Sequence, residues 1–331
     1  VGLSLTHYSQ FEVRKPIFLP QKSRILPPEI LRDIIPARKP VPRTWKPMKK
    51  IASGVYLEKS YPGVPIGAVS MDDGLLLVDA PLRPDDGREW LGTLRELNGS
   101  SDRMLVYLDA HTDRTLGGQV LESTIIAHNT VFRKFENRSA IFKAHIHETG
   151  DAWETCTGLS GIRWAAPQVA FSEEIKLRYG ETEIILEHQP GPDDGAIWVV
   201  LPKAGVVFIG DLVTQSQPPF LSQADLPTWE NSLDLLSKKY RDYKKISSRD
   251  GLIDDNNIKA MKKFISGVHK QLERLNRRKS KPQDTEKFVE KQISNFDFDP
   301  RFRNHYYQRL KYGLMHCFAR QYLELEDLSN L

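Results

Sequence analysis

This chain has few cysteines and no long apolar run. The first argues against a cysteine-based metal site, and the second against a membrane-spanning helix. Only two of its 331 residues are cysteine. Cys156 and Cys317 lie too far apart for a metal-binding spacing, so we expect free thiols in a reducing compartment. No apolar run approaches the ~18 residues of a membrane-spanning helix. The chain begins at Val1 rather than Met, which indicates a trimmed or processed terminus, and shows no secretory leader. We therefore expect a cytoplasmic protein without membrane contact.

Proline and basic residues are instead concentrated near the N-terminus. Residues 14–50 contain eight prolines and eleven Lys or Arg, against two acidic residues. Because each proline removes a hydrogen-bond donor and restricts its predecessor, this stretch predicts an extended arm over residues 1–50, with at most a short helical turn at 29–34. Interspersed apolar residues indicate that the arm wraps over a surface, either of its own domain or of a second subunit in a homodimer.

From about residue 51 the pattern becomes regular and predicts a globular fold. The 40% hydrophobic and 27% charged residues are typical of such a protein. Periodicity and turn residues predict strands at 54–59, 66–70, 75–78, 105–108, 123–127, 183–186, 196–201 and 206–209. They predict helices at 84–97, 226–240 and 256–278, and again over about the last 50 residues. Residues 132–178 give no clear pattern.

Residues 109–118 contain the closest grouping of side chains that could bind a metal ion. Asp109 and His111 follow an apolar strand, and because they are two apart their side chains point to one side of an extended backbone. Asp113 and Arg114 come next, before paired glycines at 117–118. An α/β protein presents a metal cluster in this way, with ligand-type side chains at the carboxyl end of a strand.

This stretch resembles the metallo-β-lactamase signature, His-x-His-x-Asp-His after a strand, with Asp109 and Arg114 in place of the first and last histidines. Four more landmarks of that superfamily follow the expected order: a strand and aspartate at 75–81, a His-x-Pro-Gly turn at 187–191, a strand ending in an aspartate at 206–211, and residues 243–251 in place of Pro-Gly-His-Gly. The resemblance covers about residues 50–280. It implies an α/β (α+β) fold, a four-layer αββα sandwich at 51–280, with the arm before it and a C-terminal helical extension at 281–331.

The resemblance also implies a metal-dependent hydrolase. In the intact family two metal ions activate a water and polarise the substrate. Carried over residue by residue, one metal site remains, with the ligands Asp109, His111, His188 and Asp211. Such a set would accept Zn, Fe or Mn and leave positions open for water. The expected cofactor is therefore one divalent metal, or none if the site is dead.

Arginine replaces the histidines of the second metal site, where only Asp113 and Asp211 remain. A guanidinium stays protonated and is no ordinary ligand. Arg114 and Arg249 could neutralise the carboxylates of a dead site. Alternatively they bind an anionic substrate beside one metal, with Asp113 and Arg114 as catalytic residues and Arg249 as a substrate contact. Phe220, which follows Asp211 closely, either lines the substrate pocket or plugs the core.

Two further patterns are weaker. His145 and His147, with Glu148, form a rival ligand pair, but they lack the upstream strand and we expect loop residues near the cleft. Residues 270–287 are rich in Lys and Arg, and at 301–311 basic residues are interleaved with aromatic ones, as in nucleic-acid-binding proteins. Acidic residues are also common in this region and reduce its net positive charge, so we expect a solvated helix face rather than a nucleic-acid partner.

Three functions follow from the sequence. The first is a divergent mononuclear hydrolase acting on a small ester or anionic substrate. The second is a catalytically inactive binding or scaffold module of the same fold. The third is a nucleic-acid-associated protein.

Overall fold

The computed structural model describes residues 48–95, 97, 102–144 and 149–323. All of these belong to the compact unit that begins at Pro47. Nearly all of the predicted arm, including its helical turn at 29–34, lies outside the described residues, as do His145, His147 and Glu148.

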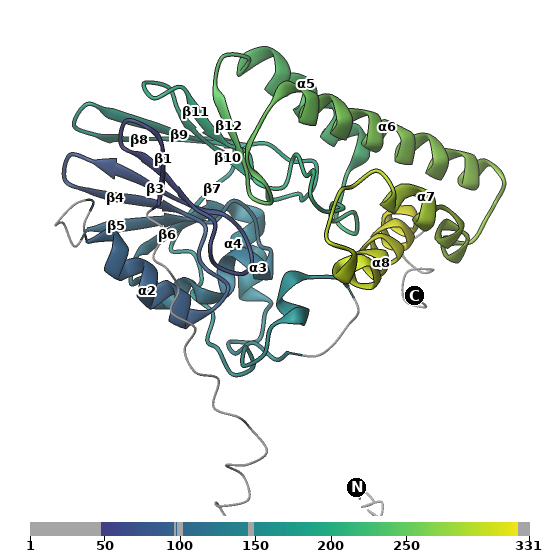
Figure 1. Ribbon diagram of the computed structural model, residues 1–331, viewed down its shortest axis with the longest axis horizontal. Coiled ribbons are helices and arrows are strands. Elements are labelled where there is room, and N and C mark those ends of the chain that lie inside the picture. The colour runs from purple at the N-terminus through teal and green to yellow at the C-terminus, as the bar shows by residue number, and fades with distance from the viewer. Residues whose placement is uncertain (1–47, 96, 98–101, 145–148, 324–331) are drawn as a thin grey trace, which may run out of the picture. The chain divides into compact units, whose positions relative to one another are not determined.

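The described strands form two mixed sheets that lie face to face (Figure 1). The first sheet runs in chain order: β1 (Lys49–Ala52), β2 (Val55–Glu58), β3 (Ile66–Met71), β4 (Gly74–Val78), β5 (Arg103–Val106), β6 (Thr124–His128) and β7 (Val169–Phe171). The second runs in the order β13 (Gly251–Ile253), β12 (Lys244–Ser247), β11 (Val206–Phe208), β10 (Ile197–Leu201), β9 (Thr182–His188) and β8 (Glu174–Tyr179). β4 to β7 pair in parallel, as do β11 and β12, so their carboxyl ends share an edge within each sheet.

β4 shows why this sequence forms a central strand. All five of its residues are buried. Alternate side chains point to opposite faces of a sheet, so Leu76 and Val78 enter the core between the sheets while Leu75 and Leu77 face the outer helices. A continuous apolar run is what a strand covered on both faces requires.

Helices cover the outer face of each sheet (Figure 1). On the first sheet, α2 (Pro84–Leu94) and α4 (Asn129–Glu136) bury Trp90 and Phe135. On the second, α5 (Leu226–Lys239) and α6 (Asp255–Arg277) share one core with α8 (Arg303–Tyr322). The result is the predicted four-layer αββα sandwich.

Local signals fix where these helices begin. Pro84 occupies the first position of α2, where its missing N–H costs no hydrogen bond. Asp225 caps α5 by accepting from the Thr228 amide, and Asp254 caps α6 within a capping box. The predicted starts at 84, 226 and 256 are therefore confirmed to within one residue.

Other segments add structure that the sequence did not predict. The unreadable stretch 132–178 contains most of α4 together with β7 and β8, and the degenerate motif at 243–251 forms β12 and most of a turn into β13. The C-terminal region is helical as expected, with η3 (Pro282–Phe288), α7 (Val289–Ile293) and η4 (Pro300–Phe302) before α8. None of the helices in the described ranges has the length and apolarity to cross a membrane.

Candidate functional site

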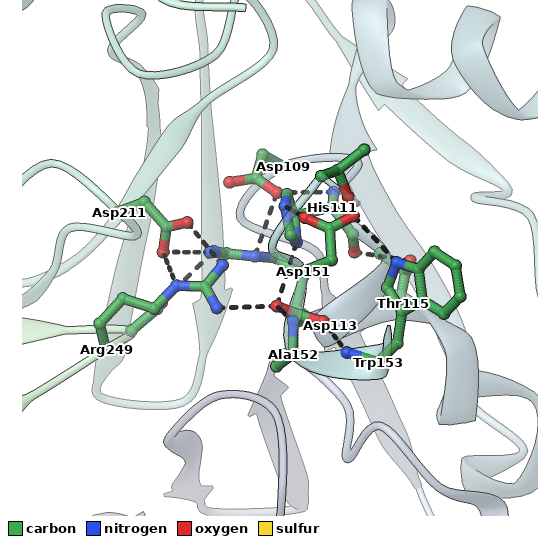
Figure 2. Close-up of polar contacts among 12 residues, drawn as sticks. Asp109, His111, Asp113, Thr115, Asp151, Ala152, Trp153, Asp211 and Arg249 are labelled. Atoms are coloured by element: carbon green, nitrogen blue, oxygen red, sulfur yellow. Dashed lines mark hydrogen bonds and ion pairs between the residues drawn. The ribbon is translucent and has the colours of Figure 1, made fainter. Parts of the chain in front are cut away.

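The site is built where several strands end. Asp109 follows β5, Asp211 follows β11, and Arg249 follows β12. Asp113 and Arg114 lie on α3 (Thr112–Thr115), a single turn that begins directly after His111. The chain thus brings the predicted site residues of the first and second sheets to one edge of the sandwich, as Figure 2 shows for most of them.

Arg249 joins two of the aspartates. Its Nε and Nη2 donate to the two carboxylate oxygens of Asp211, at 2.9 and 2.7 Å, and its Nη1 donates to Asp113 Oδ2 at 2.9 Å (Figure 2). The Asp113 carboxylate also accepts from the backbone amides of Ala152 and Trp153, at 3.3 and 3.1 Å. Only 1% of the Arg249 side chain is exposed, so these hydrogen bonds are shielded from water.

Arg114 joins three aspartates. Its Nη2 lies 2.5 Å from Asp211 Oδ1, its Nε 3.0 Å from Asp109 Oδ1, and its Nη1 3.3 Å from Asp79 Oδ2. The side chain is fully buried. Asp79, Asp109, Asp113, Arg114, Asp211 and Arg249 therefore form one connected set, which we call the ion-pair cluster.

Charge–charge contacts dominate the protonation of Asp211 and the arginines. Burial would raise the pKa of Asp211, but the guanidiniums of Arg114 and Arg249 hold it well below its usual range. Burial would likewise lower the pKa of both arginines, but their aspartate partners outweigh it and raise each pKa. Asp211 is therefore ionised and both arginines are charged across the physiological pH range.

Asp79 is the exception among the carboxyl groups. Its backbone takes a left-handed conformation, with φ of 60°, which turns Oδ1 toward the Leu108 amide at 2.9 Å. Burial raises the pKa of Asp79 to about 7, against the lowering effect of Arg114. The cluster holds four aspartates and two arginines, and a proton on Asp79 reduces its excess negative charge.

His111 lies at the border between the cluster and a cavity. Its Nε2 is 3.1 Å from Asp151 Oδ1 and its Nδ1 is 3.5 Å from Asp113 Oδ2, while its ring packs on Phe220 with 4.3 Å between centroids. Burial would lower the pKa of His111, but the carboxylates of Asp151 and Asp113 raise it overall. A carboxylate thus faces each ring nitrogen and favours the protonated form of His111, although Nδ1 forms no hydrogen bond within the described residues.

A cavity of about 360 Å³ opens beside the cluster. It is lined by Asp109, Ala110, His111, Thr112, Lys134, Arg138, Thr149, Asp151, Pro192, Asp193, Asp211, Phe220, Leu221, Ser222, Gln223, Arg309, Tyr312 and Gly313. Phe220 lines this cavity, as one of its two predicted roles required, whereas Arg249 is not among the lining residues. α8, from the C-terminal helical region, supplies one wall through Arg309, Tyr312 and Gly313.

Several lining residues escaped prediction. Lys134 and Arg138 lie at and just after the end of α4, in the stretch whose pattern was unreadable. Arg309 was assigned to a solvated helix face, but only 2% of it is exposed. Asp151 lies four residues after His147, and no sequence pattern assigned it to the site. The one sequence signal that could have found Arg309 is the aromatic residue Tyr306 three positions before it, over which its guanidinium lies.

His188 lies in a different environment from the other predicted ligands. Its ring stacks on His128 with 3.8 Å between centroids, and its Nε2 lies 2.9 Å from the Asp194 carbonyl oxygen. His128 in turn is held by the Ser172 carbonyl oxygen and by the Thr130 amide. The two histidines end β9 and β6, so their stacking links one sheet to the other.

No protein-family model and no curated protein matches this sequence, but solved structures do. The sec-alkylsulfatase Pisa1 from Pseudomonas sp. is 12% identical, with a TM-score of 0.63 over 84% of this chain and 50% of that one. A double mutant of the same sulfatase gives 13% identity and a TM-score of 0.66 with the same coverage. A metallo-β-lactamase from Pontibacter korlensis is 19% identical, with a TM-score of 0.52 over 66% of this chain and 98% of that one. The chain thus spans half the length of the sulfatase structures.

This chain has the metallo-β-lactamase fold. The sulfatase and the lactamase are hydrolases by name, and at these identities the likeness shows the fold alone.

The metal centre that the metallo-β-lactamase fold implies does not fit the residues present here. Both oxygens of Asp211 accept hydrogen bonds from guanidinium groups, and Asp109 is paired with Arg114. A metal ion would have to displace two buried cations. Across the described part of the chain, no group of three or more His, Cys, Asp or Glu residues is placed to hold a metal ion.

The predicted ligand set therefore needs correction. Asp109, His111 and Asp211 do come together, but Asp109 and Asp211 are bound by arginine, and His111 is bound by carboxylates. His188, the fourth predicted ligand, stacks on His128 instead. The physical reason is that Arg114 and Arg249 already supply the positive charge that the carboxylates require.

Proposed function

We propose that this protein binds a small organic anion in the cavity beside the ion-pair cluster and does so without a metal ion. The observation that carries this proposal is the pair of buried guanidiniums, Arg114 and Arg249, on the carboxylates that a metal would need. A buried ion pair broken by loss of one partner costs about 3–5 kcal/mol. Displacing two arginines to admit a metal would break several such pairs at once.

The charges along the cavity wall favour an anionic ligand. Asp211 and Asp109 are paired within the cluster, Asp193 with Lys134 at 2.8 Å, and Asp151 with His111. Once these carboxylates are paired, two lining guanidiniums remain, those of Arg138 and Arg309.

Neither guanidinium has a carboxylate within ion-pair distance in the described ranges. Arg309 donates to three oxygens, the Gly150 and Pro218 carbonyls and the Gln217 amide, at 2.6 to 3.0 Å. Burial and the nearby charge of Arg249 lower the pKa of Arg309 to about 10, so it remains charged. Arg138 donates to the Ala110 carbonyl oxygen, while its buried Nη1 has no hydrogen-bond partner in this part of the structure. An anion in the cavity that both residues line would be attracted by their positive charges.

The rest of the wall defines the ligand's body. Phe220, Leu221 and Tyr312 present apolar surface, and the volume of about 360 Å³ lies within the range of small-molecule sites. A carboxylate, sulfate or phosphate ester with a short apolar chain matches both features.

Titration calorimetry tests the proposal. We expect octyl sulfate or octanoate to bind and octanol not to bind, because only the first two carry the charge. Arg309→Gln and Arg138→Gln should each weaken binding at least tenfold, whereas Arg301→Gln, at an exposed position, should not. Equal affinity for octanol, or binding unaffected by both arginine variants, would overturn it.

Metal-dependent hydrolysis is the second candidate, favoured by the fold shared with an alkylsulfatase and a metallo-β-lactamase. It requires at least one equivalent of Zn, Fe or Mn in the protein purified from metal-supplemented medium, and turnover of an ester or sulfate ester. That turnover should disappear in His111→Ala. If elemental analysis finds less than about a tenth of an equivalent of Zn, Fe or Mn, and no turnover is detected, metal-dependent hydrolysis is rejected in favour of anion binding.

A further inference from the structure

The outer face of α6 carries a line of basic side chains that lies outside the cavity beside the ion-pair cluster. Residues 259–279, which cover most of α6 and its C-terminal end, contain eight Lys or Arg and one acidic residue. Five of the eight share one exposed face of the helix, and we call them the basic stripe: Lys259, Lys263, Lys270, Arg274 and Arg277. We propose that the basic stripe binds the phosphate backbone of a double-stranded nucleic acid.

The helical repeat explains why these five residues form a single line. Their spacings along α6 are four, seven, four and three residues, and residues three, four or seven apart lie on the same face of an α-helix. At a rise of about 1.5 Å per residue the basic stripe is about 27 Å long. The opposite face of α6, with Phe264, Val268 and Leu272, is buried in the core shared with α5 and α8. Burial of that face turns all five cations toward solvent.

The cations of the basic stripe form no ion pair with a carboxylate among the residues that the structure describes. Lys262, beside the stripe, pairs with Asp234, and Glu273 lies 3.9 Å from His269 Nε2. The acidic residues that follow in the sequence are paired with other cations: Asp284 with Lys287, Glu286 with Lys311, Glu290 with Arg303, and Asp299 with Arg301. The acidic residues that led us to expect a solvated helix face therefore do not pair with the stripe.

The end of α6 provides a second, independent indication. The amides of Lys279 and Ser280 donate to the carbonyl oxygens of Asn276 and Leu275, at 2.8 and 3.0 Å, which is the Schellman pattern of a helix end. In this pattern Lys279 takes the left-handed position, with φ of 53°, that glycine normally occupies. Local stability would favour glycine there, whereas an anionic partner favours a lysine, which adds an exposed cation beside Arg278.

The composition of the exposed face favours a duplex backbone as the partner. Between its cations this face carries Ser266 and Gly267, and none of the large apolar side chains exposed in the described ranges lies on α6. A membrane-surface helix would need apolar residues beside its cations, and a single-stranded partner would need aromatic residues that stack on bases. A duplex carries one negative charge per about 1.7 Å of its axis, so a straight line of cations about 27 Å long can contact several phosphates.

Fluorescence anisotropy with the full chain tests the proposal. The probes are a labelled DNA duplex and a labelled RNA duplex, each of about 24 base pairs, because both present the same phosphodiester chemistry. We expect at least one of them to bind with a Kd of about 10 µM or tighter at 50 mM KCl. Five phosphate contacts give a slope of about −4.5 for log K against log salt concentration, so an increase to 100 mM KCl should weaken binding about 20-fold.

Two charge-matched variants separate the basic stripe from the general charge of the protein. The stripe variant combines three substitutions on α6: Lys270→Gln, Arg274→Gln and Arg277→Gln. The control variant removes three exposed cations from other elements: Arg88→Gln, Arg178→Gln and Lys203→Gln. The stripe variant should bind at least tenfold more weakly, with a salt slope less steep by about 2.7, whereas the control should change affinity less than threefold. Because all six side chains are exposed, both variants should melt at the temperature of the natural protein.

Lys279→Gly separates binding from folding. Glycine suits the left-handed backbone, so the free protein should melt at a higher temperature while its affinity for the duplex falls at least twofold. The proposal is overturned if neither duplex binds, or if pure phosphatidylserine vesicles bind more tightly than both duplexes. It is also overturned if the stripe variant and Lys279→Gly bind no more weakly than the control variant. None of these outcomes bears on the anion site beside the ion-pair cluster, because no residue of the basic stripe lines that cavity.

Discussion

The guanidinium of Arg249 meets the carboxylate of Asp211 edge to edge, with Nε to Oδ1 at 2.9 Å and Nη2 to Oδ2 at 2.7 Å. This two-bond geometry fixes both planes and is available to arginine but not to lysine. The third nitrogen, Nη1, reaches Asp113 on α3. One side chain thus ties the second sheet, which carries Arg249 and Asp211, to the segment that follows β5 in the first.

Replacement of Arg249 by leucine should destabilise the protein by about 3–5 kcal/mol, because Asp211 and Asp113 would stay buried with too little positive charge. Urea unfolding followed by circular dichroism measures this. Arg301→Leu is the control, since its ion pair with Asp299 is on the surface, and we expect little change there. A loss no larger than that of the control would contradict a structural role for the cluster.

Introducing the histidines of the metallo-β-lactamase signature should make the thermal stability of the protein depend on zinc. In the triple variant Asp109→His, Arg114→His and Arg249→His, both guanidiniums are gone and imidazoles stand beside Asp113 and Asp211. We expect zinc to raise the melting temperature of this variant and to leave that of the natural sequence unchanged. A zinc-induced rise in the natural protein would show that the arginines do not block a metal.

Stability should fall as pH rises from about 4 to about 7, partly through Asp79. The pKa of this carboxyl is about 7 in the folded chain and 3.8 in the unfolded chain. Between these values the folded state holds a proton that the unfolded state has lost, which costs up to about 1.4 kcal/mol per pH unit. Asp79→Asn should remove this slope, and asparagine tolerates the left-handed backbone.

Urea unfolding at pH 5 and pH 8 checks this, with the difference between the natural protein and Asp79→Asn as the readout. The raised pKa of His111 also removes stability as pH rises, but that contribution is common to both proteins and cancels. Parallel losses in the two proteins would contradict the assignment.

Substitution of alanine for a glycine should have opposite effects on stability at the paired glycines 117–118 and at a surface glycine. A Cβ at Gly118 would lie 1.9 Å from the Tyr107 hydroxyl, so Gly118→Ala should destabilise the fold by about 1–3 kcal/mol. Gly92 has no atom within 4 Å of a built Cβ and is exposed on α2, so Gly92→Ala should stabilise by up to about 1 kcal/mol. Thermal unfolding of the two variants compares them directly, and equal shifts would refute the packing argument.

The fold was predictable where one periodicity dominates a segment. β4 is apolar throughout because both of its faces are covered, and α6 begins at an aspartate that caps it. β8 gave no such signal, since it is an edge strand whose side chains are exposed or half-buried along its whole length. β7 has only three residues, too few for a period to appear.

The site was predictable in its members and in part of its pairings, because Arg114 and Arg249 do pair with Asp211 and Asp113, as one alternative expected. The order of motifs brought Asp109, Asp113, Arg114 and Asp211 together, as expected from the resemblance. Which group each carboxylate would contact depends on side-chain directions that no local pattern encodes. His188 could face Asp109 or His128, and the pairing of β9 and β6 with their neighbours decides for His128.

The wall that α8 contributes to the cavity beside the ion-pair cluster has a consequence for the order of synthesis. Asp109 and His111 leave the ribosome about 200 residues before Arg309, Tyr312 and Gly313. Both sheets are therefore available to pair while the recess is still open on one flank. The recess is thus completed later in synthesis than the framework that supports it.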